Sequence, residues 1–71
     1  MSQVRRLETE ADFAEALERG ASIRVFKDDQ LVDARVKIIR FDDSLVVTQS
    51  SVSDIAYYDR QNCQFFELRG R

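Results

Sequence analysis

The sequence predicts an α+β, mainly β fold, in which one short N-terminal helix precedes a five-stranded antiparallel small barrel. Apolar residues first recur at one-turn spacing, up to Gly20, and from Ser22 onward they recur at every second position among many β-branched and aromatic side chains. With 71 residues the chain can bury only one core. We therefore expect a single domain over residues 1–71, with the helix at about residues 10–19 and the barrel at about residues 22–68. A flat sheet with the helix across one face is the alternative.

The helix is indicated by signals at both of its ends. Thr9 and Asp12 have the spacing of a capping box, and Glu10 adds negative charge near the positive end of the helix. Gly20 can adopt the left-handed conformation that closes a helix. The apolar stripe between these signals consists of Phe13, Ala14 and Leu17. Because an isolated helix of this length is marginal in water, we expect the stripe to dock on the sheet.

Five strands follow, separated by short turns that contain Asp, Ser or Asn. They are expected at residues 22–27, 31–41, 45–49, 52–58 and 63–68. Closing them into a barrel would remove most unpaired sheet edges. In the second strand the apolar positions alternate through Val32, Ala34, Val36 and Ile38 and then change parity at Ile39 and Phe41. A regular strand cannot change its buried face, so this switch predicts a β-bulge or a strong bend.

The composition is that of a folded domain without disulfides or membrane segments. The chain has one cysteine, no histidine, and no apolar run near the ~18 residues that indicate a membrane span. Residues 1–7 lack the apolar region of a signal peptide, so the expected location is cytoplasmic. Domains of this size commonly need a further source of stability, and association with other chains is the one that remains.

The same composition argues against an enzyme and against a bound metal or cofactor. The absence of histidine removes the commonest general base and the main metal ligand. Cys63 therefore has no histidine to activate it, and we expect a small packed side chain there. The pairs Asp28–Asp29 and Asp42–Asp43 fit turns better than a cation site, because Asp hydrogen-bonds its own downstream backbone in turns. We expect no catalytic residue, no metal and no cofactor.

The charges are unevenly distributed, although the formal net charge is only −2. The helix segment carries five acids, at Glu8, Glu10, Asp12, Glu15 and Glu18. The next segment carries five cations, at Arg24, Lys27, Arg35, Lys37 and Arg40. One interpretation is a solvated surface of mixed sign, and the other is a basic stripe that contacts RNA phosphates.

Two pairs of consecutive aromatic residues mark the last two strands. Tyr57 with Tyr58, and Phe65 with Phe66, must point to opposite faces of their strands, so one ring of each pair lies outside the core. An outward ring near Arg60 can stack on a base or anchor a protein partner. The alternatives are packing at the sheet edge and contact with another copy of the chain.

Residues 12–17 (DFAEAL), 40–47 (RFDDSLVV) and 53–57 (SDIAY) resemble, in order and character, segments of Sm-like proteins, including the Hfq-like group. The chain has Asp28 and Asp29 where the family often has an Asn-Gly turn, and Tyr58 and Asp59 where Hfq has a Lys-His step. The resemblance implies a ring in which the fourth strand after the helix pairs with the fifth strand of the next subunit, and it implies RNA bound around the pore. Arg19 would then correspond to basic residues at the rim of the ring. A general SH3-like barrel fits the strand pattern nearly as well.

The best hypothesis is a non-enzymatic, Sm-like homo-oligomer with an RNA-binding or RNA-regulatory role on single-stranded RNA. The residues expected to contact RNA are Arg24, Arg35, Lys37, Arg40, Tyr57, Tyr58 and Arg60. The residues expected at the oligomer interface are Ile55, Tyr57, Tyr58, Phe65 and Phe66. The alternative is a protein-binding adaptor, regulator or inhibitor without nucleic acid, which uses the outward rings or the acidic helix face at Glu15 and Glu18.

Overall fold

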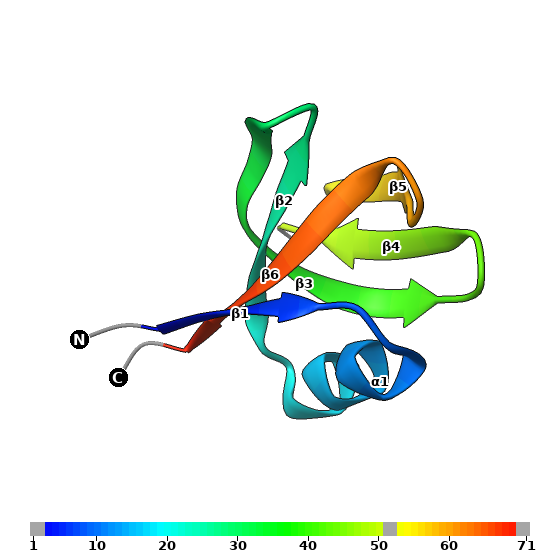
Figure 1. Ribbon diagram of the computed structural model, residues 1–71. Coiled ribbons are helices and arrows are strands. Elements are labelled where there is room, and N and C mark those ends of the chain that lie inside the picture. Colours follow the sequence, from blue (N-terminus) through cyan, green and yellow to red (C-terminus); the bar gives the residue numbers. More distant parts are fainter. Residues whose placement is uncertain (1–2, 51–52, 70–71) are drawn as a thin grey trace.

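The computed structural model describes residues 3–50 and 53–69 and is mainly β (Figure 1). The elements in chain order are β1 (Gln3–Leu7), α1 (Glu10–Arg19), β2 (Ser22–Lys27), β3 (Gln30–Phe41), β4 (Leu45–Gln49), β5 (Ile55–Asp59) and β6 (Cys63–Arg69). They form one antiparallel six-stranded sheet in the order β1-β6-β2-β3-β4-β5. The helix is present where the sequence predicts it, and so are the five expected strands. The fourth begins at Ile55, later than predicted, since residues 53 and 54 are not in a strand; position 52 lies outside the described residues.

The structure corrects the predicted strand number and closure. β1 is a sixth strand, which the sequence analysis did not predict, and it pairs with β6 from Gln3↔Arg69 to Leu7↔Phe65. Its partner β6 also pairs with β2, so the two edges of the sheet are β1 and β5. No pairing joins these edges among the described residues, and the sheet is therefore open. It is nevertheless strongly curled, because the rings of Tyr58 on β5 and Phe65 on β6 meet across the core with centroids 6.4 Å apart.

Both predicted ends of the helix are confirmed. The Thr9 hydroxyl accepts from the Asp12 N–H at 3.1 Å, and the Asp12 carboxylate accepts from the N–H groups of Thr9 and Glu8 at 3.0 and 2.9 Å. These backbone donors hold the pKa of Asp12 well below its usual range. Gly20 closes the helix with φ 62°, and its N–H reaches the carbonyls of the preceding turn.

The face that the helix turns to the sheet differs from the predicted stripe. Phe13 and Ala16 are buried, whereas Ala14 is exposed and Leu17 retains 37% of its surface. Phe13 and Ala16 are one turn apart and share a face. The small Ala16 allows the helix to approach the sheet closely while Phe13 enters the core.

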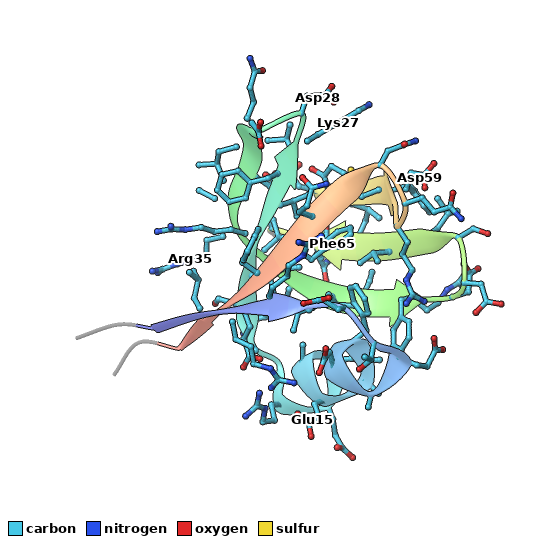
Figure 2. The ribbon with its side chains drawn as sticks, in the orientation of Figure 1. Glu15, Lys27, Asp28, Arg35, Asp59 and Phe65 are labelled. Carbon is cyan, nitrogen blue, oxygen red and sulfur yellow. The ribbon has the colours of Figure 1, made fainter. Side chains whose placement is uncertain are left out.

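The core lies between the helix and the inner face of the curled sheet, and Phe65 occupies its centre (Figure 2). The Phe65 ring is 1% exposed and meets the Phe13 ring edge-on at a centroid distance of 5.5 Å. The other buried apolar residues come from every strand except β5, as Leu7, Ile23, Val25, Val36, Ile38, Val46 and Cys63. In the part of the chain that is described, no helix is long and apolar enough to cross a membrane.

The predicted irregularity in β3 is confirmed, and a second one changes the buried positions. The register with β4 shifts between Ile38 and Arg40, at the predicted parity switch. The register with β2 also shifts, so that Asp33 lies opposite the buried Val25. Because of this second irregularity Val32 and Ala34 are exposed, contrary to the predicted alternation, and Asp33 is half-buried in their place.

Candidate nucleic-acid interface

The sheet face that points away from the core, called the outer face below, carries a row of cations around an aromatic ring. Phe66 on β6 lies opposite Arg6 on β1 and also opposite Arg24 on β2. Side chains directly opposite each other in an antiparallel sheet lie on the same face, so the half-buried Phe66 ring has a guanidinium on each side. The two arginines are exposed and form no ion pair with any described residue.

Next to this row the outer face is hollowed into an open groove of about 610 Å³, called the β2–β6 groove below. The strand register places Arg6, Phe66 and Arg24 in one part of it, Phe26 and Gln64 in the middle, and Asp28 and Asp29 in its other part. The two phenylalanine rings meet edge-on at 5.4 Å between centroids. The groove therefore combines cations, flat apolar surface and carboxylates.

Three further cations extend the basic surface along β3. Arg35 and Lys37 line a second open groove, of about 590 Å³, next to Ile39 and Gln49. Arg40 lies opposite Val47 of β4, which in turn lies opposite Tyr57 of β5. Figure 2 shows Arg35 projecting away from the sheet and from the helix. All three cations are exposed, as the alternation in the sequence predicts, and none forms a salt bridge among the described residues, although, besides backbone hydrogen bonds, the charge of Arg40 helps to lower the pKa of Asp42.

The other arginines with described contacts lie toward the helix, and each has an acidic partner. Arg19 at the end of α1 donates to the buried Glu67 carboxylate at 2.6 Å. Arg5 of β1 pairs with Asp12 and with Glu15, the latter at 3.3 Å, and these carboxylates raise its pKa. The rim role implied for Arg19 is therefore not supported, because its guanidinium neutralises a carboxylate inside the fold.

Arg60 was also expected to contact RNA, and the structure places it in a packing role instead. Its guanidinium lies over the Phe13 ring at 4.5 Å and near the Phe41 ring at 5.9 Å. It also donates to the Asp42 carbonyl at 2.7 Å and pairs with Glu10 at 3.2 Å. Only 15% of the side chain is exposed, and its contacts join the helix to the β3–β4 turn.

The two adjacent tyrosines point to opposite faces of their strand, as strand geometry requires, and only one of them is available for stacking. Tyr57 is 65% exposed on the outer face. Tyr58 points inward, where its hydroxyl donates to the Asp33 carboxylate. Burial, with this hydrogen bond and the nearby negative charge, raises the pKa of Tyr58 to about 12. The expectation that Tyr58 contacts RNA or another subunit is corrected, because its ring packs against the core.

Of the residues expected at an oligomer interface, some are exposed and others are buried in the core. Ile55 and Tyr57 lie exposed on β5, whose outer edge has no partner strand among the described residues. Phe65 is fully inside the core, so it offers no surface to another chain. Phe66 lies on the outer face but on a strand that already has neighbours on both sides.

Cys63 is a buried residue of the core. Burial raises the pKa of its thiol, which disfavours the reactive thiolate at neutral pH. Across residues 3–50 and 53–69, no group of three or more Cys, Asp or Glu residues has the arrangement of a metal site.

Sequence reasoning missed two members of the outer face, Arg6 and Phe26. Phe26 follows the buried Ile23 and Val25 at alternate parity, so its outward direction could have been predicted. Arg6 could not, because the segment QVRRL has no clear alternation and becomes a strand only by pairing with β6.

Comparisons with known proteins do not place this chain in a family. No family model matches it, and neither a curated protein nor a solved structure matches it significantly.

Proposed function

We propose that this protein is a non-enzymatic module that binds single-stranded RNA across its outer face, with arginine and lysine side chains on the phosphates and aromatic rings under the bases. Such binding has two components: positive charges that follow the RNA backbone, and exposed aromatic rings on which the bases stack. In this proposal the module is an RNA-binding or RNA-regulatory protein of the Sm-like kind, built on an open, curled sheet.

One observation carries the proposal. Arg6, Arg24, Arg35, Lys37 and Arg40 are exposed and form no salt bridge among the described residues, and all five belong to the outer face. In contrast, Arg5, Arg19 and Arg60 pair with acids near the helix. Figure 2 shows one residue of each region: Glu15 lies on the helix, and Arg35 lies on the sheet, away from the helix. The net charge of −2 therefore hides a locally basic face that attracts phosphates.

Binding of U-rich and A-rich 12-nucleotide RNAs at low salt, followed by fluorescence anisotropy, tests the proposal. Arg24→Ala is expected to weaken binding, whereas Lys27→Ala is the matched control, because Lys27 is an exposed cation on the same strand at the opposite parity. Phe66→Leu keeps apolar bulk but removes the flat ring, and it is expected to lower affinity by roughly fivefold or more. Absence of binding at low salt, or equal effects of Arg24→Ala and Lys27→Ala, would overturn the proposal.

Homo-oligomerisation is part of the proposal and rests on β5. Its outer edge, unpaired among the described strands, and its exposed Ile55 and Tyr57 suit strand pairing with a second copy. The ring implied by the Sm-like resemblance would pair β5 with β6 of the next subunit. Here β1 covers the β6 edge from Phe65 to Arg69, so a ring of that kind requires β1 to leave its place. Light scattering coupled to size exclusion, on the full chain and on a chain lacking residues 1–7, separates the two arrangements: a larger assembly only without residues 1–7 would assign the blocking role to β1.

A protein-binding adaptor is the second candidate, and a separate apolar surface favours it. Ile39, Leu45, Ile55 and Tyr57 are each at least 40% exposed, and they surround Val47 on the outer face of β3, β4 and β5. Exposed apolar residues gathered on one face are typical of protein contacts. Tyr57→Ser together with Ile55→Ser should abolish capture of a protein partner that survives nuclease treatment; capture that is unchanged by both substitutions would remove this candidate.

A further inference from the structure

The β2–β6 groove has opposite charges at its two ends. The row Arg6–Phe66–Arg24 forms one end, and the pair Phe26 and Gln64 follows it two residues along the strands. The turn residues Asp28 and Asp29 lie beyond, beside Asn62. At about 3.4 Å per residue, the arginine row and the turn are roughly 14 Å apart. An elongated ligand that lies in the groove contacts the two arginines on either side of Phe66 first, then Phe26, and finally the carboxylates.

The carboxylates are held where they are by the turn itself. Asp28 and Asp29 have φ 54° and 64°, and they form the two-residue connection between β2 and β3. Positive φ at both positions is the geometry of the tight hairpin turn that Asp and Asn tolerate. Both side chains are exposed and form no ion pair with the described residues, and Figure 2 shows Asp28 at the tip of the hairpin.

We infer that this groove binds one nucleotide of the RNA and prefers guanine there, an inference that rests on the proposed function. The phosphate lies between Arg6 and Arg24, the base stacks on the Phe26 ring beside the perpendicular Phe66 ring, and the base edge reaches Asp28 and Asp29. Guanine is the base whose Watson–Crick edge offers two adjacent donors, N1–H and the N2 amino group, and a carboxylate accepts both with its two oxygens. Uracil offers the same carboxylates a single donor, N3–H, flanked by two carbonyl acceptors, so it forms one hydrogen bond and brings carbonyl oxygens against the negative charge.

The test compares four U-rich 12-nucleotide RNAs that differ only at one central position, which is G, inosine, A or U. The G-containing RNA is expected to bind roughly tenfold tighter than the all-U RNA, and inosine, which lacks the N2 amino group, is expected to bind with intermediate affinity. The variant Asp28→Asn with Asp29→Asn should lose this preference. It should bind all four RNAs with equal or greater affinity, because two negative charges are gone. Asn accepts the left-handed turn, so the fold is expected to be retained.

A matched control removes the same charge elsewhere. Asp43→Asn with Glu18→Gln also changes the net charge by two, but these exposed residues lie outside the groove, so the preference for G should remain. Equal binding of the four RNAs by the natural chain, or a preference for G that survives Asp28→Asn with Asp29→Asn, overturns the guanine inference and leaves the proposed function standing. Absence of binding to any RNA at low salt instead rejects the proposed function.

Free guanosine 5′-monophosphate carries the same chemical groups as the nucleotide in the strand. The inference assigns the groove to a nucleotide within RNA, so the G-containing RNA should bind more tightly than the free nucleotide, because the other outer-face cations contribute only to the strand. Equal or tighter binding of the free nucleotide would overturn the assignment to RNA.

Discussion

The salt dependence of RNA binding follows from the number of unpaired cations on the outer face. If Arg6, Arg24, Arg35, Lys37 and Arg40 each neutralise one phosphate, the logarithm of the association constant falls with the logarithm of the salt concentration with a slope of about −3.5, since each contact on a single strand contributes about −0.7. Between 50 and 200 mM salt this slope corresponds to a loss of affinity of roughly 100-fold. A single substitution such as Arg35→Ala should make the slope shallower by about 0.7.

Anisotropy titrations of one labelled U-rich RNA at several salt concentrations measure these slopes. The decisive comparison is between Arg35→Ala and Arg19→Ala, because both remove one arginine but only Arg35 is unpaired. Circular dichroism under the assay conditions must show that Arg19→Ala is folded. A slope near zero for the natural chain, or the same change of slope in both variants, would refute the reasoning that separates paired from unpaired arginines.

Four predictions concern the fold. Arg19→Ala should lower the free energy of unfolding by about 1–3 kcal/mol, because it removes a partner of the buried Glu67 carboxylate, and urea denaturation should find a smaller loss in a Glu67→Gln background. Tyr58 should ionise near pH 12; since folding raises its pKa, stability should fall as pH rises from about 10 to 12, and the Tyr58→Phe variant should lack this component of the fall. Thr9→Ala should cost about 1 kcal/mol of stability at neutral pH, with an unchanged urea denaturation midpoint contradicting the capping role. Because folding lowers the pKa of Asp12, its contribution should be lost as pH falls below about 4, and Asp12→Asn should flatten this acid limb of the stability profile.

Much of the secondary structure was predictable because its determinants are local. Thr9, Asp12 and Gly20 define the helix through contacts within a few residues, and the alternation of apolar residues after Ser22 requires no distant partner. The parity switch at Ile39 likewise predicted the bulge. β1 was missed because a short segment with two adjacent arginines becomes a strand only when β6 offers its edge.

The candidate site was predictable only as far as strand parity determines it. Arg24, Arg35, Lys37, Arg40 and Tyr57 point outward, as alternation requires. The addition of Arg6 to this surface depends on the pairing of the chain ends, which sequence spacing does not reveal.

The sequence by itself therefore determined the helix, the turns and the direction of most strand side chains, since each depends on backbone preferences and on neighbours a few residues away. The tertiary structure decided which charges remain free. Arg60 and Arg19 are chemically the same as Arg24, but the curled sheet brings Glu10 and Glu67 to them from 50 and 48 residues away in the chain. An arginine that pairs with a carboxylate within the fold is not available to bind a phosphate. Contacts between residues far apart in the chain determine which arginines are paired in this way.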